Sequence, residues 1–370
     1  MTDFLYLDTD GQLADFCREL VGSPWIGIDT EFLREKTYYP RLCLVQVANE
    51  RHVACIDPLA IADLSPLGKL FTDPAIVKVL HAARQDVEVL LQGLDAAPQP
   101  LFDTQTAAAF CGLGDQVSYA ALTEAIAGVQ LAKAHTRADW SRRPLEREVL
   151  AYAADDVRYL GPLYRKLRNE LESAERTPWF EAEMAALADP AIYVVEPETA
   201  WQRLRGQSRL TDPGARGVMG TLAAWRERRA MQKNRPRRWI LTDETLLELA
   251  AAAPRSPDGL NQVSGVTGLL RAGLGDELIA AIVAGVAQPL PPSSLTALTG
   301  EQRDAAKRLA TVVRERAARM NMTPALLANR KQLEQMVRGE RDLPVLSGWR
   351  LETIGKELLA ALEKNPSLPA

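Results

Sequence analysis

The sequence of 370 residues has few cysteines and no segment suited to a membrane. Its four cysteines are far apart and form no C-x-x-C pair, which argues against a zinc site or a disulfide framework and predicts buried free thiols in a reducing compartment. No uncharged apolar run is long enough to cross a bilayer, and no basic N-terminal stretch leads into an apolar run as in a signal peptide. These absences predict a cytoplasmic protein without a membrane partner.

A phosphate-binding loop for ATP is also missing. Gly355-Lys356 is followed by Glu357, and the position five residues before Gly355 is Arg350 instead of a glycine. The Walker pattern needs both glycines and a following Ser or Thr, so we expect no ATP-driven activity. Composition sets no further limit, because 47% hydrophobic and 25% charged residues are ordinary values for a globular protein. A chain of this length has room for two or three domains.

The most informative stretch of the sequence is WIGIDTEF at residues 25–32. Its apolar start predicts a buried strand, and side chains alternate along a strand, so Asp29 and Glu31 are expected on the same face. Two neighbouring carboxylates at the end of a buried strand repel each other and are costly to desolvate. A divalent cation between them would remove that cost, because hard cations bind carboxylate oxygens. The alternative is a chance pair of acids on an exposed strand end.

The first 200 residues have the pattern of an α/β domain. Two strands at 41–48 and 52–57 are joined by a short polar turn, which predicts a mixed sheet and excludes a purely parallel one. The expected strands are 4–7, 25–31, 41–48, 52–57, 76–83 and 101–104. The expected helices are 11–20, 61–71, 86–91, 104–111, 118–127 and 144–172, with Pro66 near the start of the second.

Beyond residue 200 the strand signals largely disappear and two helical modules are predicted, at 208–288 and 295–370, on either side of the Pro-rich linker 288–294. Their expected helices are 222–231, 243–253, 300–320, 329–338 and 350–363, with a further helix starting at Pro324.

The segment 203–239 is strongly basic, with 11 Lys and Arg residues against two acids. Such a run can be a solvated helix face, but Trp225 and Trp239 flank its densest part and favour contact with nucleic acid. The candidate contacts are Arg226, Arg229, Lys233, Arg235, Arg237 and Arg238.

Further acidic residues stand where the expected elements begin or end. Asp86 lies at a junction between a loop and a helix, and Tyr152 and Asp156, four residues apart, share one helix face. Asp155 is a rival for Asp156, although its simpler role is that of a solvated helix charge. Asp103 follows a short strand and is expected to cap the helix that begins at residue 104; a role as a fifth metal ligand is the alternative.

Four carboxylates and one tyrosine fit a particular chemistry. Two divalent cations about 3.5–4 Å apart can hold the attacking and the leaving oxygen of a phosphodiester displacement. Asp29, Glu31, Asp86 and Asp156 would balance their charge. Tyr152 would orient the attacking water, because an unperturbed tyrosine pKa near ~10 disfavours base catalysis.

These motifs resemble a known family. DTEF at 29–32, HAARQD at 81–86 and YAADD at 152–156 are similar to the three motifs of the DEDD exonuclease superfamily. Ala151 stands where the histidine branch has its histidine, so the resemblance is to the tyrosine branch. The stretch 118–145 closely resembles the ribonuclease D family, and 208–288 resembles the HRDC domain, with a weaker likeness in 295–370.

The resemblance implies a ribonuclease H-like exonuclease domain at residues 1–200, with a mixed central sheet flanked by helices, followed by two all-α HRDC-like domains. It implies the metal ligands and the tyrosine named above, and two Mg²⁺ or Mn²⁺ ions. Within the matching stretch, Pro144 is expected at a helix start, and Arg143 either contacts a phosphate or forms a structural ion pair. His81 is expected to fix the turn before Asp86 by hydrogen bonding.

The implied activity is a metal-dependent 3′-5′ exoribonuclease that trims transfer RNA precursors and other small structured RNAs and releases nucleoside 5′-monophosphates. We expect it to act as a monomer. Two alternatives are a DNA 3′-5′ exonuclease, because contacts to the 2′-hydroxyl cannot be read from a sequence, and a non-catalytic RNA-binding scaffold. The presence of all four acids and the tyrosine argues against the scaffold.

Overall fold

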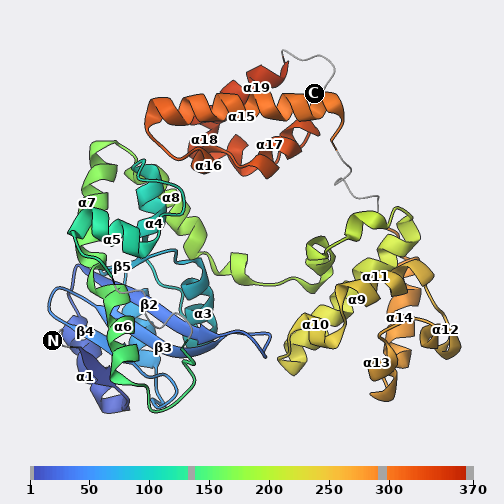
Figure 1. The fold of residues 1–370 in the computed structure, drawn as a ribbon, viewed down its shortest axis with the longest axis horizontal. Helices are drawn as coiled ribbons and strands as arrows, with labels where there is room; N and C mark the ends of the chain where they lie inside the picture. Colours follow the sequence, from blue (N-terminus) through green and yellow to red (C-terminus); the bar gives the residue numbers. More distant parts are fainter. Residues whose placement is uncertain (1–3, 132–137, 291–297, 364–370) are drawn as a thin grey trace. The chain divides into compact units, whose positions relative to one another are not determined.

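The computed structural model describes residues 4–131, 138–290 and 298–363. It divides into two compact units (Figure 1). The first unit combines Met1–Phe32 and Leu42–Pro190 with the C-terminal segment Leu298–Ala370, and the second combines Leu33–Arg41 with Ala191–Ala297. The described part of the third predicted domain, 295–370, therefore belongs to the same compact unit as the α/β domain.

The core of the first unit is a six-stranded mixed sheet in the order β1-β4-β3-β2-β5-β6. Its strands are β1 (Leu5–Leu7), β2 (Trp25–Leu33), β3 (Arg41–Ala48), β4 (Val53–Ile56), β5 (Val77–Leu80) and β6 (Leu101–Asp103). β3 and β4 are antiparallel, whereas β1 pairs with β4, β2 with β5 and β5 with β6 in parallel. The predicted mixed sheet is confirmed, and β2 lies near its centre.

The helices of the α/β domain agree with the expected pattern except in one place. They are α1 (Asp10–Leu20), α2 (Ser65–Thr72), α3 (Arg84–Leu94), α4 (Thr104–Phe110), α5 (Tyr119–Ala127), α6 (Arg147–Arg158), α7 (Leu160–Ser173) and α8 (Thr177–Ala188). The prediction of one helix over 144–172 was wrong, because the chain breaks at Tyr159 into α6 and α7. Pro144 was also misplaced, since α6 begins only at Arg147. Pro66 does lie in the first turn of α2.

The C-terminal segment of the first unit is entirely helical where it is described. Its elements are α15 (Gly300–Met320), α16 (Pro324–Leu327), α17 (Arg330–Val337), η4 (Pro344–Leu346), α18 (Gly348–Arg350), η5 (Leu351–Gly355) and α19 (Lys356–Glu363). It is attached to α8 by a specific set of contacts. Arg350 forms two bonds with the Glu183 carboxylate, at 2.5 and 2.8 Å, and the Trp349 ring stacks on Trp179 with the ring centroids 5.2 Å apart. These contacts explain why 298–363 and the α/β domain form one compact unit.

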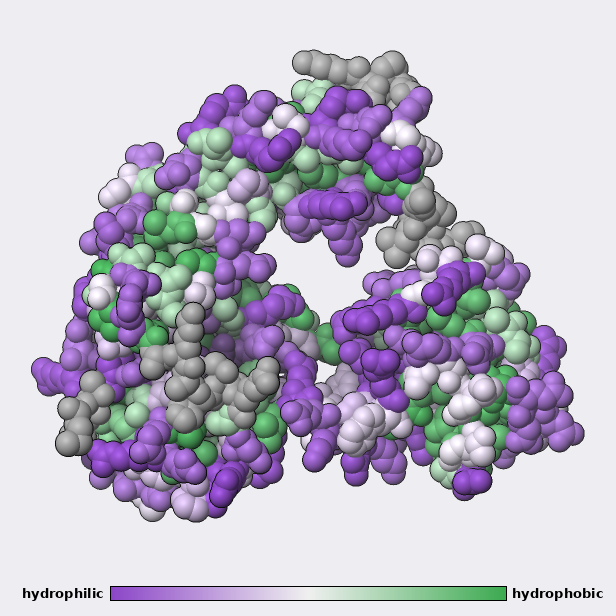
Figure 2. Space-filling view, viewed as in Figure 1, coloured by the Kyte–Doolittle hydropathy of each residue, from purple (hydrophilic) through white to green (hydrophobic). Residues whose placement is uncertain are grey.

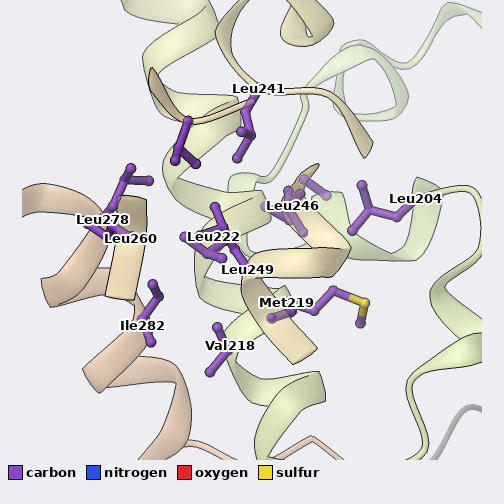
Figure 3. Close-up of a cluster of buried hydrophobic side chains, with 14 residues drawn as sticks. Leu204, Val218, Met219, Leu222, Leu241, Leu246, Leu249, Leu260, Leu278 and Ile282 are labelled. Atoms are coloured by element: carbon purple, nitrogen blue, oxygen red, sulfur yellow. The ribbon is translucent and has the colours of Figure 1, made fainter. Parts of the chain in front are cut away.

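The second unit is a helical bundle around its own apolar core. Its elements are η2 (Pro197–Arg203), η3 (Gln207–Arg209), α9 (Pro213–Lys233), α10 (Arg237–Ile240), α11 (Asp243–Ala252), α12 (Pro257–Asn261), α13 (Thr267–Arg271) and α14 (Gly275–Val286), with η1 (Pro190–Tyr193) leading into it. Figure 3 shows side chains of α9, α11 and α14 meeting at the centre, among them Leu222, Leu249 and Ile282. α9 starts well before the predicted residue 222, because Asp212 caps it and Pro213 opens it.

The segment Leu33–Arg41 between β2 and β3 belongs to this second unit. The backbone N–H groups of Tyr38 and Tyr39 donate to the Asn234 side-chain oxygen, at 3.0 and 3.1 Å, and the Tyr38 hydroxyl donates to Glu227. Glu227 is fully buried, so this hydrogen bond offsets part of the cost of burying its carboxylate.

Within the described residues, no helix combines the length and the apolar character needed to cross a membrane. Figure 2 colours one face of the molecule by hydropathy and shows hydrophilic residues over much of it, with hydrophobic residues among them.

Candidate active site

Three of the predicted acidic side chains meet above β2. Asp29 and Glu31 alternate along the strand onto one face, and Asp156 reaches them from the end of α6. One carboxylate oxygen from each of the three residues lies within 4.8 Å of the other two. These oxygens are close enough to share a cation, as the sequence suggested for the pair on the strand.

Two glycines allow α6 and α7 to lie close to β2. A Cβ atom at Gly27 would lie 3.0 Å from Cδ1 of Leu160 and 3.3 Å from the carbonyl oxygen of Val157. A Cβ atom at Gly161 would overlap the Trp25 ring. Because Gly27 precedes Asp29 on the same face of β2, this close packing sets the distance between the strand carboxylates and Asp156.

Asp86 belongs to the same electrostatic site but lies outside the three-residue cluster. It is the third residue of α3, 8% exposed, and it accepts a hydrogen bond from the Thr30 hydroxyl. Thr30 stands between the two strand acids and points to the opposite face, so one short strand segment presents two carboxylates and also holds a third. The negative charge of Asp86 raises the pKa of both Asp29 and Glu31.

All four carboxyl groups have raised pKa values. Burial and the neighbouring acids, Asp86 first, raise the pKa of Asp29 well above its usual range. Burial together with Asp156 and Asp86 raises the pKa of Glu31 to about 8. Burial raises the pKa of Asp86 to about 7, against the hydrogen bond from Thr30, and burial with Asp155 raises the pKa of Asp156 to about 7. Such a cluster is stable in its ionised form only with positive charge among its oxygens, so the donor set fits divalent cations.

Tyr152 lies one turn before Asp156 on α6. Burial raises the pKa of its hydroxyl to about 12, with contributions from the charges of Asp156, Glu31 and Asp29. The hydroxyl therefore stays protonated at neutral pH, which suits a hydrogen-bonding role and not a basic one.

Asp103 is a helix cap, as expected. Its carboxylate accepts from the backbone N–H groups of Gln105 and Thr106 at the start of α4, and also from those of Ala82 and Ala83. One side chain thus holds the turn before α3 and starts α4.

His81 fixes the same turn, as expected. Its ring nitrogens lie 2.9 Å from the Thr104 hydroxyl and 3.0 Å from the Val117 carbonyl oxygen.

Asp155 is a partly exposed helix charge, which was the simpler of the two roles predicted for it. Its carboxylate pairs with the Arg158 guanidinium at 2.8 Å.

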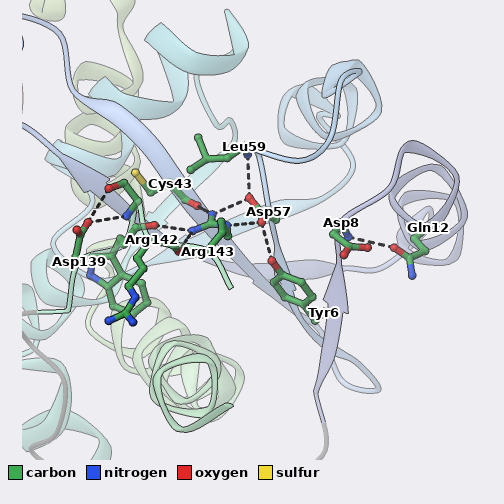
Figure 4. A network of polar contacts seen from close by, with 11 residues as sticks. Tyr6, Asp8, Gln12, Cys43, Asp57, Leu59, Asp139, Arg142 and Arg143 are labelled. Atoms are coloured by element: carbon green, nitrogen blue, oxygen red, sulfur yellow. Dashed lines mark hydrogen bonds and ion pairs between the residues drawn. The ribbon is translucent and has the colours of Figure 1, made fainter. Parts of the chain in front are cut away.

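Arg143 is a structural residue (Figure 4). Its guanidinium pairs with Asp57 through two N–H groups, one of them at 2.7 Å, and the rest donate to the carbonyl oxygens of Cys43, Trp140 and Arg142. A guanidinium has five N–H donors, and all five are used here. The prediction of a phosphate contact was therefore wrong, and the ion pair that was its alternative is what the structure contains.

The basic run in the second unit splits into buried and exposed members. Arg226 is 4% exposed and pairs with Asp243 at 2.7 Å, so its proposed role in nucleic-acid binding was wrong. Arg229 pairs with Glu277 at 3.0 Å and Arg237 lies 3.5 Å from Glu227. The exposed basic residues of the set are Lys233, Arg235 and Arg238.

Next to them, Trp239 is 58% exposed, and the Arg235 guanidinium lies 5.7 Å from the centre of its ring. This cluster keeps the combination of positive charge and aromatic surface that suggested nucleic acid.

Sequence reasoning missed two residues that hold parts of the acidic site in place. Thr30 bonds Asp86, and Tyr119 bonds the backbone on both sides of Asp156. Strand alternation placed Thr30 on the face away from the acids, and Tyr119 lay in a stretch that only the family resemblance had singled out. Neither has a sequence pattern of its own.

Comparison with known proteins first defines the class. A family model described as a 3′-5′ exonuclease matches residues 4–172, and a model of the HRDC domain matches residues 215–282. Together with the acidic site, these matches define a DEDD-type 3′-5′ exonuclease domain of ribonuclease H-like fold, followed by a helical HRDC domain.

Whole-chain relatives then identify the family. The chain is 41% identical to ribonuclease D of Granulibacter bethesdensis, with 94% of this chain and 90% of that protein covered. It is also 41% identical to ribonuclease D of Acidiphilium cryptum, over 95% and 91% of the two chains. The crystal structure of Escherichia coli RNase D matches with a TM-score of 0.87 and 33% identity, over 99% of this chain and all of that one. The protein belongs to the ribonuclease D family and is a 3′-5′ exoribonuclease. This family favours RNA hydrolysis over the two alternatives, a DNA exonuclease and a non-catalytic RNA-binding scaffold.

Proposed function

We propose that the protein trims the 3′ ends of transfer RNA precursors and other small structured RNAs and releases nucleoside 5′-monophosphates one at a time. The Escherichia coli relative is described as an exoribonuclease involved in structured RNA processing, and its fold extends over the whole chain. The observation that carries the proposal is the cluster of Asp29, Glu31 and Asp156 within 4.8 Å, with Asp86 beside it.

In the proposed reaction these carboxylates would hold two divalent cations, Mg²⁺ or Mn²⁺. Cations bound there would polarise the scissile phosphate and stabilise the charge on the attacking and leaving oxygens. The Tyr152 hydroxyl orients the water that attacks phosphorus. The bond between phosphorus and the 3′ oxygen breaks, the 3′ oxygen takes up a proton, and the terminal nucleotide leaves with its 5′-phosphate.

The second unit would hold the body of the RNA through the exposed cluster of Lys233, Arg235, Arg238 and Trp239. Contacts of this type are mainly with phosphates, so binding should weaken as the salt concentration rises. We also propose that the third predicted domain, 295–370, is HRDC-like, and that the enzyme acts as a cytoplasmic monomer without ATP.

The test uses a transfer RNA precursor with a 3′ trailer, labelled either at its 5′ end or uniformly, and a DNA strand of the trailer sequence. With Mg²⁺ or Mn²⁺, the 5′-labelled RNA should shorten stepwise from its 3′ end, and the uniformly labelled RNA should yield nucleoside 5′-monophosphates. EDTA should stop both. Asp29→Asn should reduce the rate to background, because it removes a charge from the centre of the cluster.

Asp155→Asn is the matched control, since Asp155 is a neighbouring acid on α6 that pairs with Arg158 outside the cluster. It should retain most of the wild-type rate. The proposal is wrong if Asp29→Asn and the wild type shorten RNA equally, or if EDTA has no effect. Faster loss of nucleotides from DNA than from RNA would contradict the proposed substrate.

A further inference from the structure

The break between α6 and α7 contains an inserted side chain. In a continuous helix the N–H of Tyr159 would donate to the carbonyl oxygen of Asp155, four residues earlier. Here the Tyr119 hydroxyl lies between them: it donates to the Asp155 oxygen at 3.0 Å and accepts from the Tyr159 N–H at 3.2 Å. The hydroxyl thus replaces one hydrogen bond of the helix with two of its own.

Pro162 in the first turn of α7 has no N–H to continue the helix of α6, and its ring crowds the Arg158 carbonyl, so the helix breaks here. The inserted hydroxyl bonds polar groups on both sides of this break and so fixes the path of the chain through it. The interrupted turn begins at Asp155 and ends at Tyr159, so Asp156 lies inside it. The same turn carries the Val157 carbonyl oxygen that packs over Gly27. The path of this turn therefore determines where the Asp156 carboxylate lies relative to Asp29 and Glu31.

Contacts near the turn that precedes Asp86 hold Tyr119 in place. It is the first residue of α5, which Ser118 caps, and its ring lies 5.7 Å from the ring of His81, centre to centre. His81 also contacts the carbonyl oxygen of Val117, two residues before the tyrosine. Segment 117–119 consequently connects the turn that precedes Asp86 with the turn that contains Asp156.

We propose that Tyr119 is a positioning residue of the active site, which holds the α6–α7 break open so that Asp156 faces Asp29 and Glu31. The inference rests on the proposed function only in taking these three carboxylates as metal ligands. Without the hydroxyl, the Asp155 oxygen would lose this donor and the Tyr159 N–H would keep its contact with the Val157 carbonyl oxygen, unless the Asp155 oxygen and the Tyr159 N–H bond each other. Closing that bond would draw the turn towards a regular helix and move Asp156 away from β2.

A merely structural tyrosine would affect stability alone, whereas a positioning residue affects the affinity for metal. Outer-shell residues that orient metal ligands typically change metal affinity by about 10–100-fold when they are mutated. Tyr119→Phe keeps the ring and its packing against His81 and removes only the hydroxyl. We expect the dissociation constant for Mn²⁺ to rise about tenfold or more.

The experiment measures Mn²⁺ binding to the full chain without RNA, by electron paramagnetic resonance of the free ion. Tyr164→Phe is the matched control: its hydroxyl, on α7, accepts a 3.3 Å hydrogen bond from Arg168, away from the break. A second measurement, the shift in melting temperature caused by Mn²⁺, compares each variant with itself and so corrects for any loss of stability. Tyr119→Phe should show a smaller shift than the wild type, and Tyr164→Phe the same shift.

The proposal is overturned if Tyr119→Phe binds Mn²⁺ as tightly as the wild type, whatever its melting temperature. Equal weakening of Mn²⁺ binding in Tyr164→Phe would also overturn it, because the effect would then not depend on the break. Asp29→Asn separates this result from the proposed function. If Asp29→Asn binds Mn²⁺ like the wild type, the assignment of the metal ligands is wrong, and the role of Tyr119 fails with it.

Discussion

Replacing Gly27 with alanine tests how strongly the packing of β2 determines the active site. The added methyl would lie 3.0 Å from Leu160 Cδ1, 3.2 Å from Leu160 Cβ and 3.3 Å from the Val157 carbonyl oxygen. Carbon atoms in ordinary contact are about 3.5–4.0 Å apart, so α6 and α7 must withdraw from β2 by roughly 0.5 Å. Asp156 would move with them, whereas Asp29 and Glu31 would stay on the strand.

The size of the effect follows from two opposing contributions. Overpacking a core costs about 1–3 kcal/mol, and replacing glycine with alanine inside a strand recovers about 0.5–1 kcal/mol. A net loss of about 1 kcal/mol corresponds to a fall of roughly 2–4 °C in the melting temperature of a domain of this size. Since a 1 Å misplacement can cost about 100-fold in rate, a shift of half that size should lower kcat by about tenfold.

The assay compares kcat on a short RNA at saturating Mn²⁺ with the melting temperature of the same preparation. Gly11→Ala is the control, because Gly11 lies in α1 with nothing within 4 Å of its added methyl group. It should leave kcat unchanged and keep or slightly raise the melting temperature. A destabilised Gly27→Ala enzyme with wild-type kcat would refute the reasoning, since the close approach would then serve packing alone.

Three further predictions concern other residues. Tyr152→Phe should lower kcat by about 10²-fold without changing RNA affinity, because only the water-orienting hydroxyl is lost; single-turnover rates and filter binding measure the two. Asp57→Asn should destabilise the first unit by about 3–5 kcal/mol, measured by urea denaturation, because it leaves Arg143 without its buried partner. Although burial opposes it, the hydrogen bond from Arg143 holds the pKa of Asp57 below its ordinary value, so the stability it contributes is present above pH ~4 and is lost as the pH falls further. Wild-type denaturation between pH 3 and 7 should show this loss, and Asp57→Asn should lack it. Arg226→Ala should destabilise the second unit, whereas Arg238→Ala should weaken RNA binding and lower its salt dependence by about one charge.

The sequence alone was enough to predict the strands, the mixed sheet and the three acidic residues whose carboxylates meet in the structure, Asp29, Glu31 and Asp156. Strand alternation placed Asp29 and Glu31 on one face, and helical spacing placed Tyr152 with Asp156, because both periods depend only on local backbone geometry. The cap at Asp103 was predictable for the same reason.

Features that depend on contacts between distant segments were not predictable. The stretch 144–172 contains Gly161 and Pro162, a local signal for the break, but the hydroxyl that bonds both sides of this break lies some 40 residues away in the sequence. The burial of Arg226 depends in the same way on Asp243 and on the arrangement of α9 and α11. Charge density indicated a basic surface but could not distinguish an arginine that faces solvent from one inside an ion pair.

The attachment of the C-terminal helices to α8 has a consequence for synthesis on the ribosome. Trp179 and Glu183 leave the ribosome some 170 residues before their partners Trp349 and Arg350. At about 5–20 residues per second, the nascent exonuclease domain waits roughly 10–30 s for the segment that covers this surface. During that interval the indole of Trp179 is open to chaperones and to other nascent chains. The last helices of the chain therefore close a surface that was made near the middle of translation.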